Sequence, residues 1–115
     1  CGAVTATYDS KGKTNDGYIK YIVKKIGPAF VDGFYDKKDE CIYSAIIQNA
    51  ENVAKEILEK SKGIKSAYDK GNVALLITLH HLNTGKVELI RIMHPTKWMP
   101  REIENEWNLE KNIKR

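Results

Sequence analysis

Long hydrophobic runs are missing from this sequence of 115 residues. A helix that crosses a bilayer needs roughly 18 or more consecutive apolar residues, and the longest apolar-rich stretches, 73–79 and 87–93, have the length of strands. The sequence therefore predicts no transmembrane segment. Glycine (8 residues) and proline (3 residues) are also scarce, which excludes collagen-like and low-complexity chains. A hydrophobic content of 42% instead favours a single globular domain over residues 1–115.

Blocks of like charge are absent as well. Nineteen basic residues stand against 15 acidic ones, and the resulting net charge of +4 is spread along a chain of mixed sign. An arm that binds nucleic acid typically contains a run of basic residues, whereas mild basicity favours anionic partners only weakly. We therefore expect a protein partner or self-association, and nucleic acid is the less favoured partner.

Recognisable catalytic and cofactor motifs are missing too. The sequence contains no glycine-rich phosphate loop, no CxxC, no HExxH and no serine elbow. His80 and His81 are neighbours on a predicted strand, so their side chains point to opposite faces and do not share a metal ion. We expect no cofactor and no metal, and a non-enzymatic role is favoured over an enzymatic one.

Cysteine is limited to Cys1 and Cys41. A chain that begins with Cys rather than Met is interpreted as a processed product or a fragment. An even number of cysteines favours a Cys1–Cys41 disulfide in an exported protein. The opening Cys-Gly also resembles a bacterial lipoprotein after signal cleavage, which implies a lipid anchor at Cys1. Two free thiols in a cytosolic fragment are the third alternative. We expect an extracytoplasmic location, whether secreted, periplasmic or lipid-anchored.

The N-terminal half predicts one strand and two helices. Residues 3–8 are short and β-branched, which favours a strand. Apolar residues then recur with helical spacing over 18–26. A long helix is predicted over 40–62, begun by Asp39 and ended by a left-handed Gly63. Its apolar stripe consists of Ile42, Ile46, Ala50, Val53 and Ile57.

The C-terminal half predicts a β-hairpin. Residues 73–82 and 86–94 flank Asn83-Thr84-Gly85, a three-residue loop whose last residue takes the left-handed conformation. The expected register places His80 opposite Glu88. One face carries Leu75, Ile77 and Leu79 toward the core, and the other face is also apolar in its middle, so we expect a helix or a partner to cover it.

The predicted fold class is α+β. A long helix and a shorter helix pack on a small antiparallel sheet built around the hairpin, in the order (β)-α-α-β-β-α. A further helix begins at Arg101, and residues 100–115 are expected to be loosely attached to the domain.

Two functional hypotheses follow. The first is an exported, non-enzymatic binding or assembly module, since tyrosine and tryptophan are enriched at protein interfaces. The second is a small basic ribonuclease or RNA-binding domain, in which cationic groups stabilise a phosphorane and an aromatic ring stacks on bases. The interface candidates are Leu76, Ile90, Ile92, Tyr21, Tyr35 and Trp98, and the catalytic candidates of the alternative are His94, Lys97 and Arg101.

Overall fold

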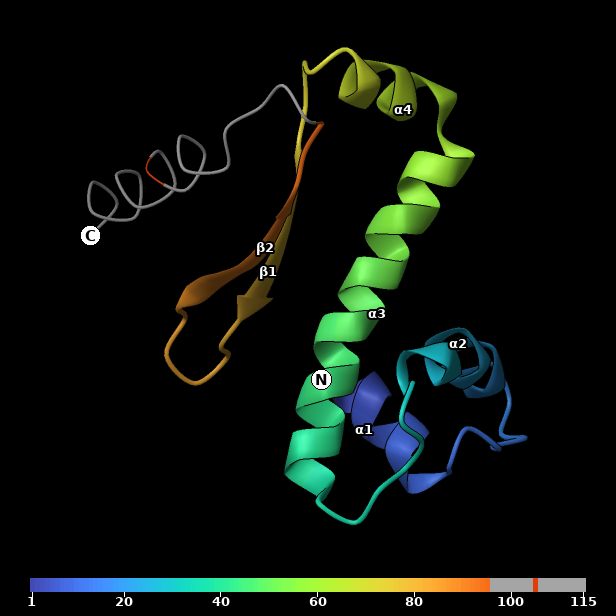
Figure 1. The fold of residues 1–115 in the computed structure, drawn as a ribbon. Coiled ribbons are helices and arrows are strands. Elements are labelled where there is room, and N and C mark those ends of the chain that lie inside the picture. Colours follow the sequence, from blue (N-terminus) through green and yellow to red (C-terminus); the bar gives the residue numbers. More distant parts are fainter. Residues whose placement is uncertain (96–104, 106–115) are drawn as a thin grey trace. The chain divides into compact units, whose positions relative to one another are not determined.

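The computed structural model describes residues 1–95 and Asn105 (Figure 1). Its elements confirm the α+β class. The chain forms two compact units, Cys1–Glu56 and Ile57–Arg115, while the expectation of one domain stays a prediction. Apart from Asn105, the helix predicted from Arg101 onward lies outside the described residues.

The elements in chain order are α1 (Gly2–Asp9), α2 (Ile19–Ile26), the 3-10 helix η1 (Gly27–Ala29), α3 (Lys38–Lys60), α4 (Lys62–Asp69), β1 (Leu75–His80) and β2 (Val87–Met93).

The strand predicted over residues 3–8 is wrong, because this segment forms helix α1. Val4 and Thr7, three positions apart, are its buried residues, and this spacing places both on one side of a helix. The Thr7 hydroxyl donates to the Ala3 carbonyl at 2.8 Å, four residues earlier. Burial of one helical face and this internal hydrogen bond therefore outweigh the β-propensity of valine and threonine.

The core of the first unit lies where α1, the end of α2, η1 and the start of α3 meet (Figure 1). Three aromatic rings pack at its edge: the centroids of Phe30 and Phe34 lie 4.7 Å apart, and Tyr8 lies 6.4 Å and 6.3 Å from them. Through these ring contacts, the connector between η1 and α3 packs against the core. The buried cluster consists of Val4, Ile26, Ala29, Phe30, Cys41 and Ala45.

The long predicted helix is confirmed as α3, but its most buried face differs from the expected stripe. Cys41, Ala45 and Ala54 are buried, whereas Val53 and Ile57 are exposed. Small side chains let the backbones of neighbouring elements approach closely, so they occupy the centre of the contact. The larger Ile42 and Ile46 pack at the edge of the same core.

The predicted end of the long helix at Gly63 is also wrong. Helix α3 ends at Lys60, and Ser61 begins α4 by accepting a hydrogen bond from the Ile64 amide at 3.3 Å. Serine is a favoured N-cap because its hydroxyl satisfies an amide that has no partner within the helix. Gly63 consequently lies inside the first turn of α4, and Asp39 lies inside the first turn of α3 rather than capping it.

The second unit contains the predicted hairpin, a two-stranded antiparallel sheet with its left-handed Gly85. The pairs Leu75–Met93 to Ile77–Arg91 follow the expected register, but an irregularity between Ile77 and Thr78 shifts the turn-proximal pairs by one residue. His80 therefore lies opposite Val87 rather than Glu88. This is the effect of a β-bulge, in which two residues of one strand oppose one of the other.

Candidate functional site

The two cysteines do not form the expected disulfide: Cys1 is an exposed free thiol, and Cys41 is a buried free thiol. The Cys41 thiol donates to the Gly33 carbonyl at 3.4 Å, so its polar atom has a partner inside the core. Cys41 therefore packs as a small apolar core residue. A hydrogen bond and an ion pair, rather than a disulfide, connect the N-terminal helix to the segment that leads into α3.

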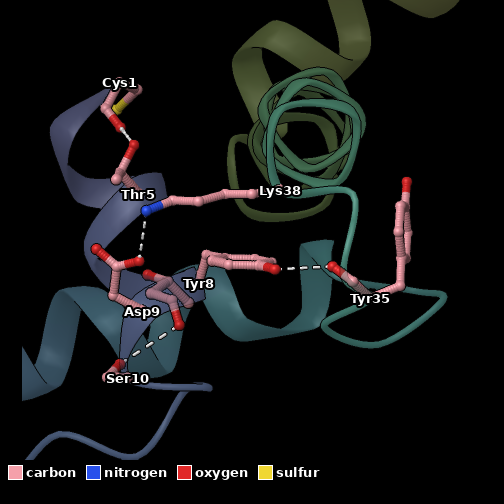
Figure 2. A network of polar contacts seen from close by, with 8 residues as sticks. Cys1, Thr5, Tyr8, Asp9, Ser10, Tyr35 and Lys38 are labelled. Carbon is pink, nitrogen blue, oxygen red and sulfur yellow. Dashed lines mark hydrogen bonds and ion pairs between the residues drawn. The ribbon is translucent and has the colours of Figure 1, made fainter.

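Figure 2 shows these contacts between α1 and the segment that leads into α3. The Tyr8 hydroxyl donates to the Tyr35 carbonyl at 2.8 Å, and the Lys38 ammonium lies 2.9 Å from Asp9 Oδ1. Lys38 also lies 5.8 Å from the centroid of the Tyr8 ring. The hydrogen bond and ion pair with Asp9 raise the pKa of Lys38. Together these contacts hold the helices that support α2.

Tyr35, an expected interface residue, takes part in this network mainly through its backbone. Its ring points away from Tyr8 (Figure 2), and Tyr35 is 37% exposed, compared with 61% for Tyr21. Desolvation, followed by electrostatic interactions with Cys41, Glu40 and Asp32, raises the pKa of the Tyr35 phenol. Tyr35 therefore supports the fold of this connector and is a weaker interface candidate than Tyr21.

The largest group of exposed apolar side chains in the described first unit lies at the start of α2. We call Tyr18, Ile19, Tyr21 and Ile22 the α2 surface; their exposed fractions are 87%, 54%, 61% and 50%. Only Val23 and Ile26 of this helix are buried. Both buried residues lie in the C-terminal part of the helix, so the core covers that part only and the apolar side chains at its start stay in solvent.

The two tyrosines of the α2 surface contact each other, and one of them also contacts a lysine. The ring centroids of Tyr18 and Tyr21 lie 6.4 Å apart, and the Lys20 ammonium lies 5.2 Å from the centroid of the Tyr21 ring. Contiguous exposed apolar side chains of this kind mark interaction sites in soluble proteins. Tyrosine rings add large contact area at a small cost in conformational entropy, because the side chain has only two χ angles.

A hollow of about 500 Å³ borders the α2 surface. We call it the lysine hollow, because its lining contains three lysines and no acidic side chain. Tyr21 belongs both to this lining and to the α2 surface, so the two features are continuous. The hollow is lined by Gly12, Lys13, Thr14, Asn15, Lys20, Tyr21 and Lys24.

A second hollow of about 480 Å³ lies on the other side of Lys24, between α2, η1 and α3. Its lining contains two lysines and one acidic residue, and the Lys25 ammonium lies 2.7 Å from Glu56 Oε2, so only the charge of Lys24 is left unbalanced. Two asparagines, Asn49 and Asn52, supply neutral polar groups to the lining. This hollow is therefore much less suited to an anion than the lysine hollow.

The interface predicted on the hairpin is only partly exposed. Leu76 is 38% exposed, whereas Ile90 and Ile92 are half-buried. Ile92 lies opposite Leu76 in the ladder, as expected, but Ile90 falls at the bulge and has no partner of its own. The hairpin face thus offers less apolar surface than α2 does.

Only one of the catalytic candidates can be placed. The His94 Nδ1 lies 2.8 Å from the Pro95 carbonyl and donates to it, whereas Lys97, Trp98 and Arg101 lie outside the described residues. His81, rather than His80, meets Glu88, at 3.1 Å between Nε2 and Oε1. No three His, Cys, Asp or Glu side chains come together as metal ligands within the described part of the chain.

Sequence reasoning predicted one residue of the α2 surface, Tyr21, and missed the others. The helical spacing of 18–26 predicts one apolar face, on which Ile19 and Ile22 lie with Val23 and Ile26, but only the last two are buried. The available signal was the excess of apolar residues: 18–26 contains three lysines and otherwise only apolar or aromatic side chains. The lysines of the hollow come from separate segments, and only the fold brings them together.

None of the described helices is long and apolar enough to span a membrane. No family model matches the chain, and no curated protein matches it closely. Its own residues therefore carry the case for its function.

Proposed function

We propose that the protein is a binding module that recognises a protein partner through the α2 surface. The observation that carries this proposal is the group of four large apolar side chains at the start of one short helix, each at least half exposed. Keeping such side chains in water costs free energy that burial against a partner recovers, at about 25 cal/mol for each Å² of apolar area.

The helix that carries the α2 surface is well supported from behind. Val23 is 1% exposed, and Ile26 belongs to the buried cluster of the first unit. A rigid support lowers the entropic cost of binding, because the interface is organised before the partner arrives. Tyrosine is also among the residues that carry most of the binding energy in interfaces.

Affinity purification on the immobilised full chain, followed by calorimetry with the isolated partner, tests this proposal. We expect the double variant Tyr18→Ser/Ile22→Ser to weaken binding by roughly 30-fold or more, the loss typical of an interface hot spot. The matched control is Val31→Ser/Tyr43→Ser, which removes exposed apolar side chains from other parts of the same unit. Equal binding by both double variants, or no partner that prefers the native chain, would contradict the proposal.

A further inference from the structure

The lysine hollow indicates what kind of protein segment the α2 surface binds. We propose that this hollow receives carboxylates of the partner, so that the recognised segment is acidic as well as apolar. This inference rests on the proposed function and adds the chemical class of the partner to it.

The lysine hollow has an unbalanced positive charge. Lys13, Lys20 and Lys24 line it, and none of the three makes an ion pair among the described residues. By contrast, Lys25 is paired with Glu56 and Lys38 with Asp9. Three ammonium groups that share a concave surface raise the local positive potential, which attracts anionic groups. The Thr14 hydroxyl and the Asn15 amide add hydrogen-bond donors to the same lining.

The lysine hollow and the α2 surface are continuous. Because Tyr21 lines the hollow and also lies on the α2 surface, one bound segment touches both. Apolar side chains of that segment would pack on Tyr18 and Ile22 while carboxylates enter the hollow. Complementary charge beside an apolar contact fixes the orientation of a partner and discriminates against uncharged ones.

The surroundings of the hollow favour an acidic protein segment over nucleic acid. Residues 1–56 contain no arginine and carry eight acidic residues against eight lysines, whereas nucleic-acid binding depends on an extended basic surface. Tyr18 and Tyr21 have rings on which a base could stack, but the aliphatic Ile19 and Ile22 beside them add contact area that suits apolar side chains of a protein. A two-fold pair of α2 surfaces is disfavoured as well, because it would bring the lysines of two copies together.

Two capped synthetic peptides test this inference by NMR titration of the isotope-labelled full chain. One alternates glutamate with leucine or phenylalanine, and its twin has glutamine in place of every glutamate. We expect the acidic peptide to shift the α2 amides and to bind roughly tenfold more tightly at low salt. This preference should shrink as salt screens the charges.

Matched lysine variants separate the two proposals. Lys13→Gln/Lys24→Gln should abolish the preference for the acidic peptide while binding of the neutral twin persists. Lys55→Gln/Lys62→Gln removes two exposed charges that do not line the hollow and should leave the preference intact. Unchanged dispersion of the amide spectrum verifies that each variant is folded.

Three other results would overturn this inference, and one of them would also overturn the proposed function. If both peptides bind the α2 surface equally and the lysine variants change nothing, the inference is overturned and the proposed function stands. If Tyr18→Ser/Ile22→Ser changes neither titration and neither peptide shifts the α2 amides, both fail. Tighter binding of a thymidine oligonucleotide than of the acidic peptide to the same amides overturns the inference in favour of nucleic acid.

Discussion

At the residue scale, the interior of the first unit contains polar atoms that the backbone satisfies. The Thr7 hydroxyl donates to the Ala3 carbonyl, and the Cys41 thiol donates to the Gly33 carbonyl. A buried polar group without a partner costs about 1–3 kcal/mol, so these hydrogen bonds allow threonine and cysteine to occupy core positions. Both side chains are small, which suits the close approach of α1 and α3 to their neighbours.

The different exposure of the two thiols gives the first prediction. We expect a thiol reagent to modify Cys1 rapidly in the folded protein, and Cys41 only after unfolding, because a buried thiol is out of reach of the reagent. Mass spectrometry before and after denaturation measures both reactions. Cys1→Ser is the control and should be unreactive until it unfolds. Thiols that stay protected in the denatured chain until a reductant is added would contradict the prediction.

A second prediction concerns alkaline pH. The Asp9 contact raises the pKa of Lys38 above its usual 10.5, so the folded chain holds this proton more tightly than the unfolded chain. The stabilisation is fully present below the unfolded value and is lost as pH rises through the folded value. Burial raises the pKa of Tyr35 in the same direction. The free energy of unfolding should therefore fall above about pH 10.

Urea unfolding at a series of alkaline pH values measures this loss. Lys38→Met should be less stable than the native chain at neutral pH and should show a shallower decline with pH. Lys55→Met removes an exposed lysine from α3 for which no ion pair is seen in the described chain, and it should follow the native profile. Identical slopes in all three proteins would mean that the Asp9 contact contributes nothing.

At the element scale, the break between α3 and α4 gives the third prediction. Gly63 lies in a helical turn with an ordinary φ and open space around its Cβ position. Gly63→Ala should therefore stabilise the protein by about 0.5–1 kcal/mol. Gly85 has φ +73°, so Gly85→Ala should destabilise it by about 1–2 kcal/mol. Denaturant unfolding measures both. Destabilisation by Gly63→Ala would contradict this prediction and would instead support the left-handed Gly63 expected from the sequence.

Elements with a clear repeat were predictable from the sequence. The periodicity of 40–62 and the Asn83-Thr84-Gly85 loop gave α3 and the hairpin, because both signals are local. Residues 3–8 were mispredicted, because whether valine and threonine lie in a helix or a strand depends on what covers them. The predicted register was wrong in the half of the hairpin near the turn, because the bulge shifts the pairing there by one residue. A one-residue shift in pairing changes which side chains of the two strands share a face.

The candidate site was less predictable than the fold. Tyr21 was found because aromatic side chains are general interface candidates. The lysine hollow combines residues 12–15 with α2, and no repeat or motif links the two segments. Which apolar residues of α2 stay exposed depends on how closely α1 and η1 cover it, and the sequence does not encode that locally.

At the scale of the whole molecule, the predicted disulfide was one of two arguments for export. Because both thiols are free, that argument no longer applies, and the extracytoplasmic location stays a prediction. The lipid anchor at Cys1 likewise stays a prediction. The proposed binding function depends on neither, since the α2 surface is exposed by the packing of the first unit alone.

The fourth prediction separates this function from the ribonuclease alternative. If the chain is a binding module, the full-length protein should leave a fluorescent RNA uncleaved, and His94→Ala should bind the acidic peptide as the native chain does. In the ribonuclease, His94→Ala would abolish cleavage, because His94 would be the acid or base of the reaction. An RNA cleavage assay and a peptide titration, performed on both chains, measure the two outcomes. Cleavage lost on this substitution would establish the alternative.

The bulge in the hairpin also affects which sequence changes the hairpin can tolerate during evolution. It separates the ladder into a distal part, where Leu75 to Ile77 keep their pairs, and a tip around the turn whose alternation is independent. An insertion or deletion near the turn would reorient the tip alone and leave the distal pairs in place. The sequence of the tip can therefore be exchanged, in evolution or by loop grafting, without changing the strand pairs in the rest of the hairpin.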